Sequence, residues 1–420
     1  MNKQLVNQIL ITLGFLLLYR LLAYVPVPGV DIDVIASFFN SDETNALGLM
    51  NMFSGNAIER LSIISLGIMP YITASIIMEL LAATFPALAQ MKKDRDGMVK
   101  YMQIIRYATI GITIVQAIGV SIGLQSLTGP DGSSAILIDH TTFMLVAMVS
   151  MVAGTVLLMW FGEQITQSGI GNGISLIIFA GIVSSIPSAI GQTVTMLNTG
   201  AMSFITVIGI LVLIFATVFV IIYVELGERR IPVTYAKKTI MQNQNKRVMN
   251  YIPIKVNLSG VIPVIFASAL LMFPMTVLST STNPIIQSIS DVLNPNGYLY
   301  HLLTFLFVVF FAYFYASIVF NAKDIADNLK RQGGFIPGVR PGESTALFLN
   351  ETASRLTFTG SIYLGLVATL PWIIVSAMGV PFFFGGVAVL IIVQVALDTM
   401  RKVEAQIYSS KYQTLSAVGL

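Results

Sequence analysis

Long, mostly apolar stretches recur along the chain, separated by shorter segments rich in charge, glycine or proline. A helix needs roughly 20 such residues to cross a bilayer, and its backbone hydrogen bonds must close inside the segment. The runs are too long for the strands of a membrane barrel and lack their alternation. The pattern therefore predicts ten transmembrane helices, at residues 5–25, 63–85, 104–124, 141–162, 173–190, 202–223, 258–278, 298–320, 356–377 and 382–400.

Charge distinguishes the two sides of the predicted membrane. If the N-terminus and every second connection share one side, that side holds all of the 23 lysines and arginines except Arg20 and Arg60. The opposite connections are acidic. Because basic residues gather on the cytoplasmic side of membrane proteins, we expect a multi-pass protein with both termini in the cytoplasm and an even number of spans.

Two predicted cytoplasmic connections, residues 225–257 and 321–355, are much longer than a tether requires. Connections of this length in compact proteins usually have a function. Both mix glycine, proline and aromatic residues with charge, which favours a docking role. The alternative is that they are charged segments that only fix the topology.

The composition agrees with a bilayer as solvent and excludes several kinds of chemistry. The chain is 55% hydrophobic and 10% charged, with a mean hydropathy of +0.82, whereas soluble domains are about 25% charged. It has no cysteine, and its two histidines lie far apart, so we expect no metal site. No P-loop, HExxH or GxSxG motif occurs. We therefore expect neither enzyme activity nor a cofactor, and any work must be driven from outside this chain.

A short pattern occurs twice, in the second and the seventh predicted helix. Residues 67–75 and 260–268 share glycine, proline, isoleucine, alanine and serine in register. A weaker match relates the fifth and tenth helices, where Gly173 and Gly386 each precede an isoleucine by five residues. These matches predict two halves of five helices, residues 1–200 and 201–420, of which the second is inverted in the membrane. Interrupted helices at matching positions of inverted halves indicate a central pathway.

The predicted pathway has two functional interpretations. A secondary transporter also uses inverted repeats, but its coupling site needs ionisable groups at depth. Here the central repeat positions are Ile72, Ile178, Ile265 and Ile391, and aliphatic side chains can close a pore by excluding water. The residues thus favour a gated pore, with a transporter of a small solute as the alternative. The external segment 51–60 is either re-entrant or an interfacial helix.

Several longer motifs are typical of a known family: residues 51–55 with 66–75, 160–166 with 169–175, 228–231 with 235–237, and 327–330 with 335–343. On these motifs the chain resembles the SecY family, the central subunits of bacterial Sec translocons, from Arg20 to Tyr412. The resemblance implies an all-α integral membrane protein with ten helices around an hourglass pore. Its expected function is to pass unfolded secretory polypeptides across the bacterial plasma membrane and to release transmembrane segments sideways into lipid.

The resemblance also implies roles for individual residues. An aliphatic ring that closes the pore corresponds to Ile68, Ile72, Ile174, Ile178, Ile265 and Ile391. A plug near residues 50–62, which closes the outer funnel, includes Asn51, Met52, Phe53, Ser54, Gly55, Asn56, Ala57 and Ile58. A lateral gate between helices 2 and 3 and helices 7 and 8 includes Thr73, Glu79, Ser268, Ala269 and Phe273.

The partners implied by the resemblance are of three kinds. The SecA motor ATPase or the ribosome would engage basic cytoplasmic residues, namely Arg229, Arg230, Lys237, Lys238 and Arg340. The small membrane subunits SecE and usually SecG accompany the family. Signal sequences, the nascent polypeptide and membrane lipid are the remaining partners. Basic loops also suit ribosomal RNA phosphates.

Overall fold

The structure is a computed structural model, described over residues 3–41, 51, 54–125, 134–235, 250–278, 297–377 and 385–417. Helices up to residue 200 are α1 (Lys3–Leu22), α2 (Ile32–Ser41), α4 (Met69–Thr84), α5 (Pro86–Lys93), α6 (Arg95–Gln125), α7 (His140–Ser168) and α8 (Gly173–Asn198). Later helices are α9 (Phe204–Glu225), α11 (Ile262–Leu278), α13 (Tyr298–Val319), α14 (Ala322–Arg331), α15 (Glu343–Ala377) and α16 (Gly386–Ala417). The strands are β1 (Glu228–Tyr235), β2 (Asn250–Lys255) and β3 (Gly334–Phe335).

Each predicted span coincides with a helix, in order α1, α4, α6, α7, α8, α9, α11, α13, α15 and α16. Within the described residues, seven helices are long and apolar enough to cross a membrane, and eight if α4 and α5 form one bent span. α11 is apolar over the shorter stretch Ile262–Leu271. α16 carries Asp398, Arg401 and Lys402 near its middle. The expectation of a mostly helical, multi-span membrane protein is confirmed.

The second predicted span is wrong at its start. The sequence predicts a helix from residue 63, but α4 begins at Met69 and residues 55–68 form turns. Gly67 has φ +57°, a left-handed conformation that glycine adopts without strain. Pro70 lies in the first turn of α4, where its missing N–H removes no helical hydrogen bond. The apolar residues before Met69 therefore enter the interior as turns.

Other helix boundaries also differ from the prediction, because apolar length alone does not mark the end of a helix. α6 and α15 begin before their predicted spans, and α16 continues beyond its span into polar sequence. At the end of α4, Phe85 is extended because Pro86 follows it, and α5 leaves at 110° to α4.

The expectation of an all-α protein needs one correction, since the two long connections that are predicted to be cytoplasmic contain strands as well as helices. The first contains the strands β1 and β2, and the second contains α14, β3 and the start of α15. β1 lies between β2 and β3 and is antiparallel to both. In β1 the buried side chains Ile231 and Val233 alternate with exposed ones, which is typical of a strand covered on one face. They pack with Leu329 and Leu349 of α14 and α15, so the two connections form one folded unit, hereafter called the cytoplasmic unit after its predicted side.

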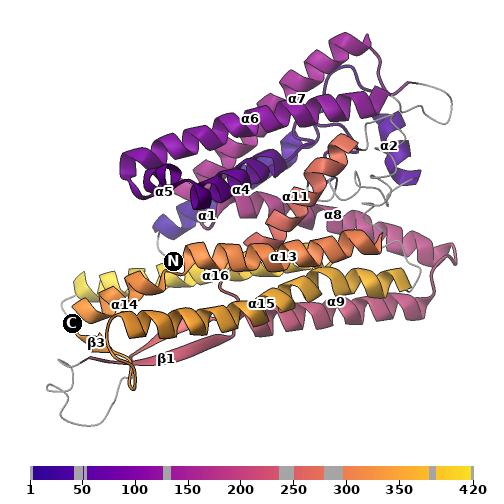
Figure 1. The fold of residues 1–420 in the computed structure, drawn as a ribbon. Helices are drawn as coiled ribbons and strands as arrows, with labels where there is room; N and C mark the ends of the chain where they lie inside the picture. The colour runs from indigo at the N-terminus through magenta and orange to yellow at the C-terminus, as the bar shows by residue number, and fades with distance from the viewer. Residues whose placement is uncertain are drawn as a thin grey trace.

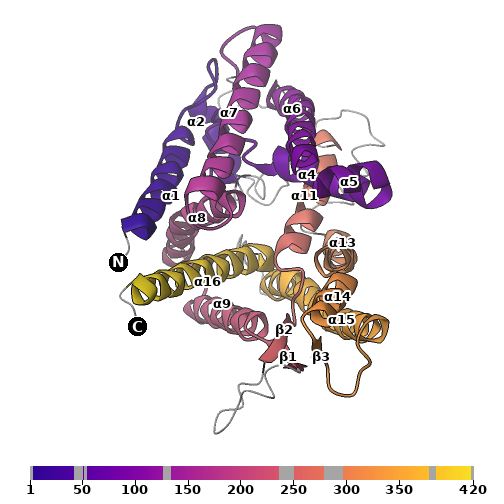
Figure 2. The ribbon, with the colours of Figure 1, turned by 90° about the vertical axis from the view of Figure 1, so that its left-hand side faces the viewer.

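The helices form two groups, with α6 and α7 in one and α9, α13, α15 and α16 in the other (Figures 1 and 2). α11 lies between them and contacts α4 and α6 on one side and α13, α15 and α16 on the other. Both chain ends, the sheet and α5 lie at one end of the molecule, and α2 lies at the opposite end (Figure 1). The end with the sheet is the one that the charge pattern predicts to be cytoplasmic.

The sequence repeat has a counterpart in the backbone. Gly67 and Gly260, which precede α4 and α11, have φ values of +57° and +65°. Ser75 and Ser268 each donate a hydrogen bond to the carbonyl of the isoleucine three residues earlier, at 2.8 and 2.9 Å. The repeated residues therefore make the same local structure twice.

Close helix contacts follow the same correspondence. Gly173 and Gly386 begin α8 and α16, and a Cβ on either would collide with a backbone carbonyl of the preceding long helix. These carbonyls belong to Gly162 in α7 and Val367 in α15. Such approaches are open only to glycine. The shared features support two related units, whose boundaries at residues 1–200 and 201–420 stay a prediction.

Candidate functional site

The six predicted ring isoleucines come from four elements that meet in the middle of the protein. They are Ile68 and Ile72 at the start of α4, Ile174 and Ile178 in α8, Ile265 in α11, and Ile391 in α16. All belong to the main apolar cluster of the protein, which takes residues from most of the described helices; five of the six are buried and Ile174 is partly buried. α4 contacts α11, α11 contacts α16, and α16 contacts α8. Apolar side chains on four elements that contact one another in turn are compatible with a water-excluding seal.

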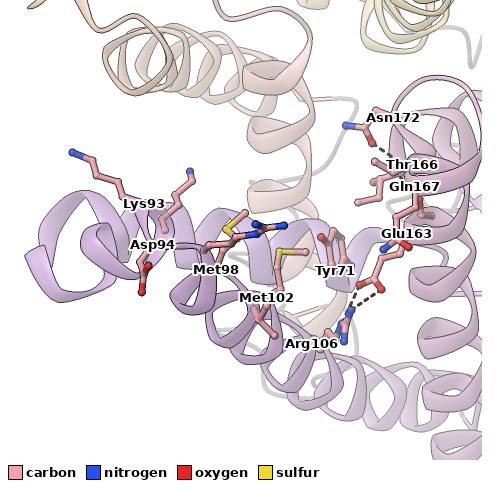
Figure 3. Close-up of a pocket in the computed structure, with 15 residues that line it drawn as sticks. Tyr71, Lys93, Asp94, Met98, Met102, Arg106, Glu163, Thr166, Gln167 and Asn172 are labelled. Atoms are coloured by element: carbon pink, nitrogen blue, oxygen red, sulfur yellow. Dashed lines mark hydrogen bonds and ion pairs between the residues drawn. The ribbon is translucent and has the colours of Figure 1, made fainter. Parts of the chain in front are cut away.

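A cavity of about 680 Å³ adjoins this cluster (Figure 3). Its wall includes Ile174 and Tyr71, next to Ile72, and extends to Lys93 and Met98 near the junction of α5 and α6. The cavity therefore connects the isoleucine cluster with the end of the molecule that carries the basic residues. A lining that mixes flexible methionine with charge can accommodate chains of varied sequence.

One ion pair joins α6 and α7 in the cavity wall. Arg106 Nε and Nη2 donate to the two carboxylate oxygens of Glu163 at 3.0 and 2.6 Å (Figure 3). The two parallel bonds fix both planar groups. Because the Arg106 side chain is 43% exposed, the pair contributes only about 0–1 kcal/mol to stability. Its main effect is to orient the two helices beside the cavity.

The segment 51–60 lies inside the protein over its described residues. Met52 and Phe53 are outside those residues, whereas Asn51, Ser54, Ala57 and Ile58 are buried. An interfacial helix would expose one face to the membrane surface. The observed burial instead fits the re-entrant interpretation.

The backbone of this segment turns sharply and is stabilised by hydrogen bonds to the side chain of Asn51. Gly55 and Asn56 have φ values of +71° and +64°. The Asn51 side-chain oxygen accepts hydrogen bonds from the backbone N–H groups of Ile58 and Glu59, both at 3.1 Å. Asn51 thereby closes the turn that these two residues form.

The predicted gate residues lie where the two helix groups meet, at the contact of α4 with α11. Thr73 and Ser268 are buried, and each hydroxyl donates to a carbonyl of its own helix, at 3.1 and 2.9 Å. Ala269 is also buried, while the Phe273 side chain is outside the described residues. Because both hydroxyls are satisfied within their own helices, α4 and α11 can separate without breaking these hydrogen bonds.

Glu79 links α4 to α5. Its Oε1 lies 3.3 Å from Lys92 Nζ, and its Oε2 is buried with no hydrogen-bond partner among the described residues. In that part of the chain, no group of acidic side chains and histidines is placed to hold a metal ion. The ion pair with Lys92 therefore joins the C-terminal half of α4 to the end of α5.

The described docking residues are exposed on the cytoplasmic unit. Arg229 and Arg230 lie in β1, and Arg340 follows β3. Lys237 and Lys238 lie outside the described residues. Because β1 pairs with β3, basic residues from two distant connections reach one end of the molecule.

A buried polar cluster at the base of the β1–β2 hairpin was not expected from the sequence. Glu225, the last residue of α9, is 4% exposed, and its carboxylate accepts from Asn257 Nδ2 at 2.6 Å and Gln394 Nε2 at 3.1 Å. Arg401 Nη2 donates to the backbone carbonyl of Glu225 at 3.0 Å. The cluster connects α9, the link into α11, and α16. The signals of it in the sequence are an acid at the end of an apolar helix and Gln394, a polar residue inside the last predicted span.

Comparison with known proteins agrees with this geometry. The SecY family profile matches residues 62–400. The chain is 67% identical over 420 residues to protein translocase subunit SecY of Helicobacter pylori, covering all of both chains. It is 42% identical over 421 residues to the Escherichia coli K12 protein of the same name, covering 98% of this chain and 94% of that one. The chain belongs to the SecY family. As a member of this family it is a non-enzymatic channel subunit of a Sec translocon, and the small-solute transporter alternative is set aside.

Solved structures of SecY-like channels share the fold. A protein-conducting channel superimposes with a TM-score of 0.68 at 18% identity, over 96% of this chain and 93% of that one. Sec61 in a canine ribosome–channel complex gives a TM-score of 0.65 at 18% identity, with the same coverage. At this identity the likeness concerns the fold alone.

Proposed function

We propose that the six isoleucines form the seal of the polypeptide-conducting pore. The observation that supports this most directly is that the six lie in the main apolar cluster, on four elements that contact one another in turn, beside the cavity of Figure 3. A ring of branched apolar side chains excludes ions because it gives water no polar partner. The side chains of the ring can also move apart to let a polypeptide pass, whatever the sequence of that polypeptide.

The ring is tested by ion conductance. Replacing Ile72 and Ile391 by serine should raise the resting conductance of the purified translocon complex in planar bilayers, since each hydroxyl offers water a partner inside the seal. Ile205→Ser is the matched control, because Ile205 is 80% exposed on α9, on the lipid-facing surface. Conductance equal to that of wild type in the Ile72→Ser/Ile391→Ser variant would exclude these residues from the seal.

We also propose that residues 51–60, hereafter the plug segment, close the external side of the pore. Their burial and their direct continuation into α4 support this role. The contact of α4 and α6 with α11 and α13 would be the lateral gate, through which signal sequences and transmembrane segments pass into lipid. The internally satisfied hydroxyls of Thr73 and Ser268 support a contact that opens and closes.

The cytoplasmic unit is the proposed docking surface for the SecA motor ATPase or the ribosome. Exposed Arg229, Arg230 and Arg340 support it, and a solved relative is a ribosome–channel complex. We place the protein in the bacterial inner membrane with both termini in the cytoplasm, on the basis of its charge distribution. SecE and SecG are the proposed small subunits, on the family resemblance alone.

A further inference from the structure

Arg20 and Arg60 are the two basic residues that the charge pattern leaves outside the cytoplasmic side. Arg20 lies in the last turn of α1, within the candidate span Leu5–Leu22. An ionisable side chain at membrane depth is costly and usually has a functional partner. The position of Arg20 therefore calls for an explanation beyond topology.

Arg20 bonds directly to the backbone of the plug segment. Its Nη1 donates to the carbonyl of Gly55 at 2.8 Å and to Ser184 Oγ in α8 at 2.7 Å. The Ser184 hydroxyl in turn donates to the carbonyl of Gly181 at 2.6 Å, so its oxygen is free to accept from Arg20. One guanidinium nitrogen thus connects α1, the plug segment and α8.

Tyr19, the residue before Arg20, bonds to Ser54, the residue before Gly55. Tyr19 is 1% exposed, and its hydroxyl donates to the carbonyl of Ser54 at 2.9 Å. Two consecutive side chains of α1 therefore bind two consecutive carbonyls of the plug segment. This pairing fixes the register of the segment against α1 as well as its position.

The fit around Gly55 leaves no space for a side chain. A Cβ at Gly55 would lie 2.8 Å from both Arg20 Nη1 and Ser184 Oγ, and 3.0 Å from Gly181 Cα. Gly55 also has φ +71°, where other residues are strained. The absence of a side chain lets the carbonyl reach the guanidinium while the backbone rests on α8.

The chemistry of the contact allows release. In the described part of the chain, the ion pairs do not include Arg20, and the groups it bonds to are neutral. Hydrogen bonds from a charged donor to neutral dipoles are strong in a dry site, yet water can replace them when the site opens. A carboxylate partner would instead leave a second charge to be solvated.

We propose that Arg20, with Tyr19 and Ser184 as supporting residues, is the latch that holds the plug segment in the closed position. The inference rests on the proposed plug role of that segment. Arg20 is a positioning residue, which sets the balance between closed and open states without touching the polypeptide. Arg60 does not serve this purpose, because it is part of the plug segment and pairs with Glu59 inside that segment at 3.8 Å. Both arginines lie over the Tyr24 ring, Arg60 at 4.2 Å and Arg20 at 5.9 Å from its centroid.

Resting ion conductance of the reconstituted translocon complex tests the latch. In Arg20→Gln we expect the resting open probability to rise about ten-fold or more, since each hydrogen bond from a charged donor contributes roughly that factor. Arg20→Lys keeps the charge and one donor group, so it should restore part of the closure. Arg355→Gln is the matched control and should stay within about two-fold of wild type, because Arg355 lies on α15 away from the plug segment and its pair with Glu351 is exposed.

A thiol-labelling rate reports the position of the plug segment independently. The chain has no cysteine, so Ser54→Cys introduces its sole thiol at a site that is 3% exposed. We expect a membrane-impermeant maleimide to label this thiol about ten-fold faster when Arg20→Gln is present. If Arg20→Gln fails to assemble, Ser184→Ala removes only one acceptor and should raise both readouts by a smaller factor.

The outcomes separate the latch from the pore. Conductance and labelling that do not change in Arg20→Gln, while Ile72→Ser/Ile391→Ser raises conductance, would overturn the latch and leave the seal standing. Unchanged conductance in the ring variant, with faster labelling in Arg20→Gln, would support the latch and overturn the seal. An equal rise in Arg355→Gln would overturn the latch in favour of a general effect of positive charge.

Discussion

Replacing Asn257 by alanine should destabilise the protein far more than its size suggests. Asn257 is 3% exposed and lies between β2 and α11. Its Nδ2 donates to Glu225 Oε1 at 2.6 Å and to the Gly260 carbonyl at 3.2 Å. Its Oδ1 accepts from Ser259 Oγ and from the Gly260 N–H, both at 3.1 Å. A single side chain therefore closes the turn that begins α11 and partners a buried carboxylate.

The size of the expected stability loss follows from the Glu225 carboxylate, which Asn257→Ala leaves buried with one hydrogen bond fewer. A hydrogen bond to a charged group contributes about 1.5–3 kcal/mol, and a buried polar group left unpaired costs about 1–3 kcal/mol. Removing one partner of a buried charge costs about 3–5 kcal/mol in well-studied cases. Gln394 still donates to the other oxygen of Glu225, at 3.1 Å, which limits the loss. We expect Asn257→Ala to lower the free energy of unfolding by about 3–5 kcal/mol.

The assay is denaturant unfolding of the purified complex in mixed micelles, with Asn321→Ala as the matched control. Asn321 is exposed, caps α14 through the Asp324 N–H, and donates to the Asp324 carboxylate at 2.6 Å. Loss of such a cap costs about 1 kcal/mol. Both substitutions replace asparagine by alanine and remove the same side-chain atoms. Only Asn257→Ala removes them from beside a buried carboxylate.

A double-mutant cycle with Glu225→Gln isolates the bond itself. Residues in direct contact within one network usually show coupling of about 0.5–3 kcal/mol. We expect the double variant to lose less than the sum of the two single losses. The reasoning would be refuted if Asn257→Ala cost no more than Asn321→Ala, or if the cycle were additive.

Two further predictions concern packing and docking. Gly173→Ala and Gly386→Ala should each lower the free energy of unfolding by about 1–3 kcal/mol or more, because their Cβ atoms would meet backbone carbonyls. Gly191→Ala in α8 is the control, because a Cβ there meets open space, and it should be neutral or stabilising by up to about 1 kcal/mol. Thermal unfolding measures the three variants, and equal melting temperatures for them would contradict the close packing at Gly173 and Gly386. Arg229→Glu/Arg340→Glu should weaken ribosome binding and reduce the slope of log affinity against log salt by about one per lost phosphate contact. Co-sedimentation across a salt series measures that slope, and an unaltered slope would remove these arginines from the docking surface.

The sequence predicted the positions and order of the apolar helices because each one depends on its own residues. The length of an apolar stretch indicates whether the segment can lie in lipid, and the position of lysine and arginine indicates which side of the membrane each connection faces. The same property explains the error at residues 63–68, which are as apolar as a span but form turns before α4. Hydropathy does not distinguish a helix in lipid from turns inside the protein. The pairing of β1 with β3 was missed for a related reason, since it joins residues about a hundred positions apart.

The repeat allowed four of the isoleucines to be singled out before the structure, and local backbone features at Gly67 and Gly260 agree with it. Arg20 was visible in the sequence as an exception to the charge pattern, but its role was not. Its acceptors, Gly55 and Ser184, lie 35 and 164 residues away, and Gln394 lies 169 residues from Glu225. Solvent preference and charge bias are properties of single segments, so the sequence determines them. Which polar group satisfies which buried partner depends on how the helices pack, and only the tertiary structure decides it.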